Sequence, residues 1–405
     1  MATITIDGQQ VSVEPGQTVI QAAEKLGIYI PRYCYHPGLS IAGSCRMCLV
    51  EIENMPKLQI ACYTQAQDGM NVITQSEAVY QARQAMLEFL LINHPLDCPV
   101  CDQSGECDLQ NFYMEHGRYD SRFIENKIKR KKAFPIGPHV LLDQERCILC
   151  TRCVRFTDEI SKTHELGCFN RGNRSVIDLY PGKRLENLYS GNVVDICPVG
   201  ALTEREFRFK CRVWYLRSEE SICNGCARGC NINIHFNSTR TYKAGGRRVQ
   251  RIKPRYNPHV NEWWISDVGR FGFEFIDQNR IEFPYRREEN ELQNSDWESA
   301  LDQAAQELQE AYEDDPASIG VILSPQLSNE DLYLAKKLFI DALQLPNIAL
   351  ENPWEKRGIE DDFLLKADRN PNTRGAHEIG IKGSAREILE KAAKGEIRFL
   401  YIFWH

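Results

Sequence analysis

The N-terminal part of the chain has the alternation of a β-hairpin, followed by the periodicity of a short helix. Apolar and polar residues alternate over Thr3–Ile6 and Val11–Val13, on either side of an Asp-Gly turn, as in two paired strands. Thr18 and Gln21 then have the spacing of a capping box, and apolar residues at helical spacing follow until Gly27. The pattern therefore predicts a hairpin and one amphipathic helix.

Further along, the pattern predicts a longer helix and several short strands. Apolar positions recur at helical spacing over 77–93, and Pro95 ends this helix because proline disfavours helical geometry in the preceding residue. The last third has the pattern of an α/β domain, in which a buried strand precedes a helix. The predicted strands are Leu49–Ile52, Leu58–Ala61, His139–Leu142, Ser318–Leu323 and Arg398–Phe403, and the predicted helix of the last third is Asn329–Leu343.

These elements predict an α+β protein with several domains. In the first domain a hairpin, a helix, a cysteine loop and further strands follow each other in the order of a β-grasp ferredoxin. The final α/β segment contains few strands for a complete sheet, so we expect it to be a partial domain. The predicted segments are 1–77, 78–125, 138–215, 216–272 and 273–405.

Composition narrows the class of protein. The chain has 405 residues, of which 42% are hydrophobic and 26% charged, as in ordinary globular proteins. The net charge of −7, with both signs mixed along the chain, argues against a nucleic-acid partner. One basic stretch, 127–132, is predicted to be a solvated linker or else a surface for an acidic partner.

The N-terminus lacks the pattern of a secretory signal, and the longest apolar run, Met86–Ile92, is too short to span a bilayer. We therefore expect membrane contact only through partner proteins. The 16 cysteines, in a chain without an export signal, indicate a reducing compartment, where cysteines serve metal or redox chemistry more often than disulfides. Their spacing identifies that chemistry.

The first cysteine motif has the spacing of a 2Fe–2S site. Its members are Cys34, Cys45, Cys48 and Cys62. A loop with one close pair supplies three thiolates, and the fourth comes from the end of a neighbouring strand. Gly43 and Ser44 let the backbone approach the sulfides and offer N–H donors that tune the potential. The alternatives are a zinc site or buried cysteines that bind nothing.

The second motif combines one histidine with three cysteines. Its members are His94, Cys98, Cys101 and Cys107. Three thiolates and one imidazole can close a 4Fe–4S cluster. A neutral imidazole in place of a thiolate removes one negative charge, so the reduced state is less penalised and the potential rises, as in Rieske centres. A histidine beside a proline is usually structural, but this one lies four residues before cysteines at ligand spacing.

The third motif is a bacterial ferredoxin run whose last cysteine lies far downstream. Its members are Cys147, Cys150, Cys153 and Cys197. This spacing predicts a second 4Fe–4S cluster. In two-cluster ferredoxins a further cysteine stands where this chain has Thr157, so we expect no additional cluster in this domain. Of the two cysteines outside all motifs, Cys168 is predicted to be a small buried residue, and Cys211 has no assigned role.

The three motifs, in this order, resemble the large iron–sulfur subunit of NADH–quinone oxidoreductase (respiratory complex I), the 75 kDa iron–sulfur subunit family. The resemblance covers roughly residues 1–345 and implies a truncated molybdopterin-oxidoreductase-like domain at the end, without bound molybdopterin. It implies an electron relay between a flavin- and NADH-binding subunit and quinone-proximal iron–sulfur subunits. It also implies a peripheral arm on the cytoplasmic face of the inner membrane.

A fourth motif, Cys223, Cys226 and Cys230, resembles the cluster motif that opens molybdopterin-type domains. In relatives that carry a cluster there, the fourth cysteine precedes an Asp-x-Gly-Arg-Phe-Gly string, and in this chain Ser266 holds that position. A serine oxygen is a harder and more basic ligand than a thiolate. Three outcomes stay open: a labile 4Fe–4S cluster, a three-iron cluster, or no cluster.

The sequence contains no Gly-x-Gly-x-x-Gly or Walker-type loop and no candidate nucleophile–base pair, so no catalytic residue is predicted. The chemistry belongs to the cofactors. Three alternatives share some of these features. They are the diaphorase iron–sulfur subunit of an NAD-linked hydrogenase or formate dehydrogenase, a stand-alone molybdopterin oxidoreductase, and a zinc scaffold without redox activity.

Overall fold

The computed structural model describes every residue of the chain except 1, 240–241, 243–245, 289, 352–357 and 404–405. The chain forms two compact units. Unit 1 comprises Met1–Ser218 and His235–Arg251, and unit 2 comprises Glu219–Ile234 and Ile252–His405. The first three cysteine motifs lie in unit 1, and the fourth lies in unit 2.

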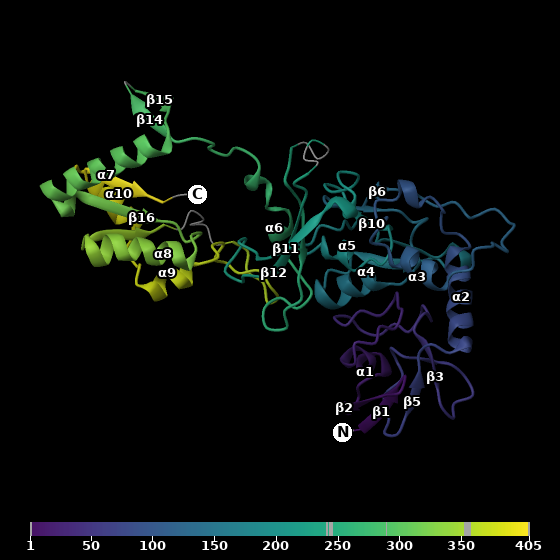
Figure 1. The fold of residues 1–405 in the computed structure, drawn as a ribbon. Coiled ribbons are helices and arrows are strands. Elements are labelled where there is room, and N and C mark those ends of the chain that lie inside the picture. The colour runs from purple at the N-terminus through teal and green to yellow at the C-terminus, as the bar shows by residue number, and fades with distance from the viewer. Residues whose placement is uncertain (1, 240–241, 243–245, 289, 352–357, 404–405) are drawn as a thin grey trace. The chain divides into compact units, whose positions relative to one another are not determined.

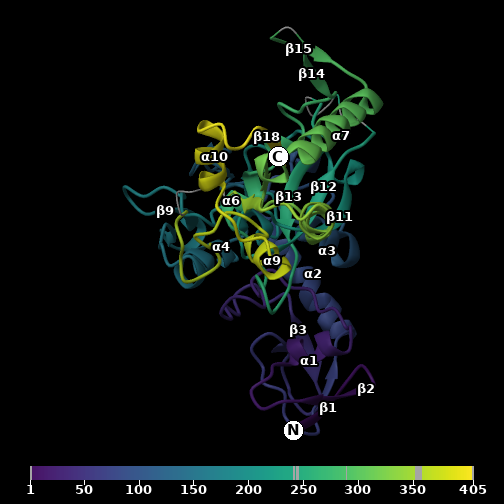
Figure 2. The same ribbon diagram turned by 90° about the vertical axis from the view of Figure 1, so that its left-hand side faces the viewer.

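Unit 1 begins with a five-stranded mixed sheet covered by one helix (Figures 1 and 2). In spatial order its strands are β2 (Gln9–Val13), β1 (Ala2–Ile6), β5 (Asn71–Ile73), β3 (Leu49–Ile52) and β4 (Gln59–Ile60). β1 and β5 pair in parallel, and the other pairs are antiparallel. The helix α1 (Val19–Lys25) begins at the predicted capping box, in which the Thr18 N–H donates to Gln21 Oε1 at 2.9 Å. Its apolar face packs with Ile4 and Ile6 in one core.

Two helices follow the sheet and carry the second motif at their ends. α2 (Glu77–Leu91) begins at Ser76, whose hydroxyl accepts a hydrogen bond from the Val79 N–H at 3.3 Å. It ends three residues before His94, as the proline predicts. A short 3₁₀ turn, η1 (Cys98–Val100), and the helix α3 (Asp108–His116) follow.

The basic stretch that follows is bound to the rest of unit 1, so the prediction of a solvated linker is wrong for part of it. The Lys127 ammonium donates to the carbonyls of Leu91 and Ile92 at 2.7 and 2.9 Å. These carbonyls end α2 and have no partner within the helix, which is why a cation is stabilised there. Lys132 forms an ion pair with Glu145 at 3.0 Å.

The rest of unit 1 holds the third motif on short elements. α4 (Arg152–Arg155) continues directly into a π-helical turn, η2 (Phe156–Ile160), and the short helix α5 (Asn192–Asp195) precedes Cys197. Thr157, which stands where two-cluster ferredoxins have a cysteine, is buried, and its hydroxyl donates to the Val154 carbonyl at 2.9 Å. The three-stranded sheet beside these helices consists of β10 (Leu202–Glu204), β7 (Val140–Leu142) and β6 (Phe134–Pro135).

Cys168 is exposed, which contradicts the prediction that it is buried. It lies on β8 (Leu166–Phe169), which pairs only with β9 (Val176–Leu179) in a two-stranded ribbon. Such a ribbon has no third strand to cover it, so its apolar residues are buried only where it meets the core. Leu166 lies at that end and is buried.

Three strands, β11 (Arg217–Ile222), β12 (Asn231–Phe236) and β13 (Val249–Pro254), form a sheet in this order, and the boundary between the units falls within them. The fourth motif occupies the loop between β11 and β12. The short helix α6 (Asp267–Phe271) follows β13, and a hairpin of β14 (Tyr285–Glu288) and β15 (Glu291–Asn294) comes after it.

Unit 2 ends in a small α/β domain. Its parallel sheet has the order β17 (Asn347–Leu350), β16 (Ile319–Leu323), β18 (Phe399–Ile402). β16 is buried throughout, as predicted. Its helices are α7 (Trp297–Asp314), α8 (Asn329–Ala335) with the π-turn η8 (Lys336–Ala342), α9 (Thr373–Ile379) and α10 (Ala385–Ala393).

The sheet of this domain is covered on both faces. Val321 packs in one core with Phe339 of η8, and Ile322 packs on the opposite face with Ile388 of α10. Figure 1 shows α8 on the other side of β16 from α10. In the described part of the chain, no helix is both long enough and apolar enough to cross a membrane.

Candidate metal centres

The first motif lies in the loops at one end of the N-terminal sheet. Cys45 and Cys48 precede β3, and Cys62 follows β4, so the strand pairing brings these cysteines together. Cys34, Cys48 and Cys62 are buried, and Cys45 is half-buried. Hydrogen bonds join the side chains of Cys34 and Cys45, and those of Cys48 and Cys62. The structure therefore brings all four members of the motif to one place.

Backbone and hydroxyl donors face these sulfurs. The hydrogen bond with Cys45 lowers the pKa of Cys34, and hydrogen bonds from the Ser44 side chain and backbone lower it further. Gly43 has φ +60, a conformation that favours glycine, and a Cβ there would lie 3.3 Å from Ile60. The donors predicted at Ser44 are therefore present, whereas the close neighbour of Gly43 is Ile60 and not a sulfur.

His94 is a neutral imidazole, and one of its ring nitrogens has no hydrogen-bond partner. Burial lowers its pKa to about 4, and the Arg146 guanidinium contributes in the same direction. The ring Nδ1 is buried without a hydrogen-bond partner. The ring also forms a hydrogen bond with the backbone of Arg146. A metal-ligating histidine has this pattern: it is neutral, one nitrogen is oriented by a hydrogen bond, and the other is available.

The three cysteines of the second motif interact in sequence order, because Cys98 acts electrostatically on Cys101 and Cys101 on Cys107. Cys107 occupies the N-cap of α3, where the backbone N–H groups of Gln110 and Leu109 act to lower the pKa of its thiol. Burial nevertheless raises the pKa of Cys107 to about 11. Gly200 lies against Cys101, because a Cβ built at this glycine would be 2.4 Å from the Cys101 Sγ. The backbone thus closes around this sulfur in a way that only glycine permits.

The third motif lines a single cavity. This cavity is small, about 20 Å³, and its walls are otherwise mostly apolar side chains such as Leu142 and Ile177. Burial raises the pKa of all four thiols, and backbone N–H groups oppose that shift; Leu149 donates to the Cys147 sulfur at 3.4 Å. The four cysteines in the wall are Cys147, Cys150, Cys153 and Cys197.

One apolar core joins the three motifs of unit 1. It contains Cys45 of the first, Cys107 of the second, and Cys147, Cys150 and Cys197 of the third. Large apolar side chains fill the space between them: Tyr33, Met47, Leu87, Leu109, Phe112 and Val199. The three candidate centres are therefore adjacent and shielded from water.

The fourth motif lies in unit 2 with its three cysteines buried. Burial raises the pKa of Cys223, and Gly269 lies so close that a Cβ there would be 2.5 Å from the Cys223 sulfur. Ser266, one helical turn earlier, is buried, and its hydroxyl accepts a hydrogen bond from the Gly269 N–H at 3.3 Å as the N-cap of α6. The serine is therefore near the cysteines, with its oxygen engaged by the helix.

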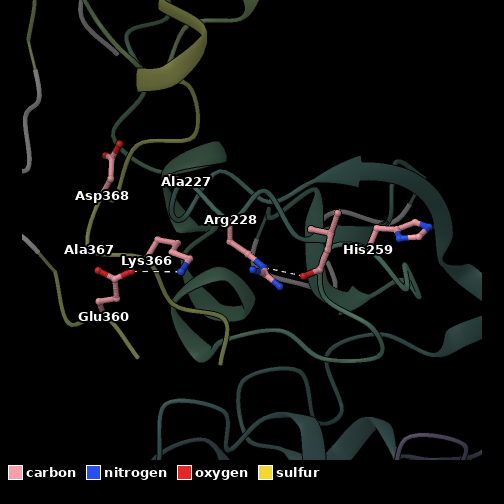
Figure 3. A pocket seen from close by; sticks show the side chains of 8 residues that line it. Ala227, Arg228, His259, Glu360, Lys366, Ala367 and Asp368 are labelled. Carbon is pink, nitrogen blue, oxygen red and sulfur yellow. Dashed lines mark hydrogen bonds and ion pairs between the residues drawn. The ribbon is translucent and has the colours of Figure 1, made fainter. Parts of the chain in front are cut away.

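An open pocket of about 600 Å³ lies next to the fourth motif (Figure 3). Two of its charged side chains already interact with other groups of the chain. Lys366 pairs with Glu360 at 3.3 Å, and the Arg228 Nε donates to the Val260 carbonyl at 2.7 Å. His259 points away from these groups. The pocket offers both signs of charge and no set of convergent donors for one class of ligand.

In the described residues, no three histidine, cysteine or acidic side chains converge as a site for a single metal ion. In a 4Fe–4S cluster each ligand binds a different iron atom, and in a 2Fe–2S cluster two ligands bind each iron, so the four ligands do not have to converge on one metal ion. The fit to a cluster rests on the donor set, on the four cysteines that line one cavity at the third motif and on the unpartnered Nδ1 of His94.

The sequence analysis did not identify the arginines whose hydrogen bonds connect the segments around these motifs. Arg146 directly precedes the third motif, and Arg152 and Arg155 lie within it. All three bond to segments more than forty positions away, such as Asp97 at 2.8 Å from Arg146. A basic residue between cysteines carries no pattern that predicts such contacts. Gly200 was also missed, and its place after Cys197-Pro198 was the only available signal.

Family models match consecutive parts of the chain. They are a 2Fe-2S iron-sulfur cluster binding domain (1–77), an NADH-ubiquinone oxidoreductase-G iron-sulfur binding region (83–122), the ferredoxin-like domain of NADH-quinone oxidoreductase subunit 3 (137–203), an NDSU1/NuoG-like 4Fe-4S domain (216–274) and a molybdopterin oxidoreductase domain (280–359). The matched domains contain the grouped cysteines described above. The chain is therefore an iron–sulfur protein with domains of the 2Fe–2S and 4Fe–4S types.

Curated relatives are similar over most of this chain. The mitochondrial NADH-ubiquinone oxidoreductase 78 kDa subunit of Neurospora crassa is 43% identical over 86% of the chain, and an NADH-quinone oxidoreductase subunit of Streptomyces coelicolor is also 43% identical over 86%. The 75 kDa subunit of Reclinomonas americana is 41% identical over 89%. The chain belongs to this family of 75–78 kDa subunits and their bacterial counterparts. It spans 46%, 40% and 51% of the length of these three relatives.

One solved structure is also similar. A chain in the crystal structure of an NAD⁺-reducing [NiFe]-hydrogenase in the H₂-reduced state is 34% identical, and the match covers 52% of this chain and 91% of that one with a TM-score of 0.48. This TM-score is too low to support a common arrangement of the whole fold. The curated relatives, at 41–43% identity over most of the chain, support the family of 75–78 kDa subunits more strongly than the hydrogenase alternative.

Proposed function

We propose that this chain is the iron–sulfur electron-transfer subunit of an NADH–quinone oxidoreductase. The observation that carries the proposal is the apolar core of unit 1, in which cysteines of all three motifs meet. Clusters held there would accept and release single electrons within a short distance of one another. The chain's own residues bind the clusters, orient them and exclude water.

The proposed ligands follow the motifs. A 2Fe–2S cluster is held at the first site, and 4Fe–4S clusters are held at the second and third sites. His94 contributes neutral imidazole in place of a thiolate. The ligand sets are Cys34, Cys45, Cys48 and Cys62; His94, Cys98, Cys101 and Cys107; and Cys147, Cys150, Cys153 and Cys197.

At the fourth site we propose at most a labile or three-iron cluster. Three buried cysteines are present, but Ser266 engages its hydroxyl with the Gly269 N–H. A hard oxygen that already caps a helix is a poor fourth ligand for iron in a sulfide cluster. We propose no molybdopterin for the α/β domain that follows.

The proposed partners are a flavin- and NADH-binding subunit on one side and quinone-proximal iron–sulfur subunits on the other. The relatives named above are subunits of NADH–quinone oxidoreductases. Membrane contact is proposed only through such partners, on the cytoplasmic face of the inner membrane.

Anaerobic EPR spectroscopy of the reduced chain, together with iron and sulfide analysis, tests the proposal. We expect one 2Fe–2S and two 4Fe–4S signals and about ten irons per chain. Cys150→Ala should lose one 4Fe–4S signal and leave the 2Fe–2S signal, whereas Cys168→Ala, which changes an exposed cysteine outside all motifs, should lose none. Protein that lacks inorganic sulfide after anaerobic reconstitution would contradict the proposal.

The fourth site has its own test. Ser266→Cys should raise the iron count from about ten to about fourteen, because a thiolate replaces the oxygen at the position of the fourth ligand. Ser266→Ala, which removes the cap but adds no thiolate, serves as the control. An unchanged count in Ser266→Cys would mean that the geometry of this site does not accommodate a cubane.

A further inference from the structure

Arg155 bridges the loops of the first and third sites. Its Nη2 donates to the Cys34 carbonyl at 2.5 Å and to the Cys150 carbonyl at 3.3 Å. Its Nη1 donates to the carbonyl of Ser40, farther along the first loop. One guanidinium therefore contacts the peptide of a proposed ligand at each of the two sites.

Arg152 makes a parallel connection one helical turn earlier on α4. Its Nη2 donates to the Tyr35 carbonyl at 2.6 Å, and its Nη1 donates to the Ile196 carbonyl at 3.1 Å. Tyr35 follows Cys34, and Ile196 precedes Cys197. Positions three apart lie on the same face of a helix, so both guanidinium groups face the same junction.

The acidic group on which Arg152 acts is Asp108: burial raises the pKa of its carboxyl, and the charge of Arg152 opposes that rise without a direct ion pair. Arg152 is only 8% exposed, and in the part of the chain that is described neither arginine forms an ion pair with a carboxylate. The nearby Glu159 instead accepts the Ser40 N–H at 2.8 Å. A buried cation that forms no direct ion pair is costly, so further negative charge at this junction would stabilise both arginines.

The proposed clusters supply that charge. A cluster held by four thiolates is anionic, and reduction adds one more negative charge. Backbone carbonyls accept hydrogen bonds from the Nη groups of both arginines but do not neutralise their charge, and the Arg152 Nε is buried without a hydrogen-bond partner. The junction therefore fits two anionic clusters that share a pair of cations.

We propose that Arg155, with Arg152 beside it, is a shared positioning residue that joins the first and third sites and raises the reduction potentials of both clusters. The inference rests on the proposed function, because it requires clusters at both sites. A positive charge near each cluster stabilises its reduced form. The second site depends on a different cation, because Arg146 is the arginine that acts on Cys101 and His94.

The test is a potentiometric titration of the cluster-loaded 405-residue chain, followed by EPR. In Arg155→Gln we expect the reduction equilibrium constants of the first and third clusters to fall about tenfold, or about 59 mV for one electron. The potential of the cluster at the second site should stay unchanged. Arg184→Gln is the matched control, since Arg184 lies in the same domain with a side chain that is 67% exposed.

Arg155→Lys separates the effect of the positive charge from the effect of the hydrogen bonds that the guanidinium donates. Its single ammonium keeps the positive charge but cannot donate to three carbonyls, so a smaller shift than in Arg155→Gln is expected. If Arg155→Gln binds no cluster at one of the sites, Arg152→Gln, which removes the other charge of the junction, is titrated in its place, and less than a twofold change at both sites would contradict the proposal.

The failures can be told apart. If the unaltered chain shows no cluster signals, the proposed function is wrong. If both clusters are present in Arg155→Gln and their potentials match those of Arg184→Gln, the clusters exist but the role of Arg155 is wrong. A shift confined to one cluster would also contradict a shared role.

Discussion

At the scale of single residues, burial and hydrogen bonding act in opposite directions on the cysteines. Burial raises the pKa of Cys107 and of the third-site thiols, whereas backbone N–H groups aimed at the sulfurs lower it. Thiolates without a metal would be costly in such an environment. The donors are therefore arranged for sulfurs that become thiolates when iron binds.

His94→Cys should lower the reduction potential of the cluster at the second site. The thiolate adds one negative charge where the imidazole added none, and the comparison with Rieske centres suggests a shift on the order of 100 mV. EPR-monitored redox titration measures this shift, and the iron count should stay the same. His116→Cys, which changes a histidine outside the motif, is the control. An unaltered potential would exclude His94 as a ligand.

Gly200→Ala should prevent assembly of the same cluster. The new Cβ would lie 2.4 Å from the Cys101 sulfur, a distance that real Cβ atoms do not tolerate. Iron analysis should show a loss of about four irons per chain, with the other two EPR signals retained. Gly16→Ala is the control, because its Cβ meets no atom within 4 Å although its φ of +86 also strains the backbone. A full complement of iron in Gly200→Ala would count against Cys101 as a ligand.

At the scale of elements, short helices and strand ends position the proposed ligands. The sequence correctly predicts those features that depend on residues close together in the chain. The capping box of α1, the end of α2 near His94 and the buried strand β16 follow directly from residue patterns. Contacts between distant segments do not: the bond from Arg152 to the Tyr35 carbonyl spans 117 positions. β17 was missed, although Pro346 precedes it, because its four residues are too few for a usable pattern, and the exposure of Cys168 depends on how its ribbon meets the core.

Lys127→Ala should loosen the end of α2 beside His94. The lysine satisfies the carbonyls of Leu91 and Ile92, and its loss should cost about 0.5–2 kcal/mol locally. Hydrogen exchange should therefore speed up in the last turn of α2. Lys129→Ala, which removes an exposed lysine from the same stretch, should leave exchange unchanged. Equal exchange in both variants would mean that the carbonyls are satisfied equally well by water.

At the scale of the whole molecule, the division into two units separates the redox core from the α/β domain. The first three motifs lie in unit 1, whose central core is built partly of cysteines. Unit 2 has a conventional core around β16, made of aliphatic and aromatic side chains. The stability of unit 1 should therefore depend on its cofactors, whereas that of the β16 core should not.

Removal of iron tests this dependence across the molecule. Anything that binds the folded state and not the unfolded one stabilises folding, and the clusters bind several segments of unit 1 at once. Stripping the chain of iron with a chelator and an oxidant should accelerate hydrogen exchange in α3, in α4 and in the loops of the three motifs. Exchange in β16 and α8 should stay as it is in the loaded chain, which makes these elements the internal control. Uniform loss of protection in both units would show that they fold as one cooperative body. The β16 core would then depend on the cofactors as much as the core of unit 1 does, and the prediction would be wrong.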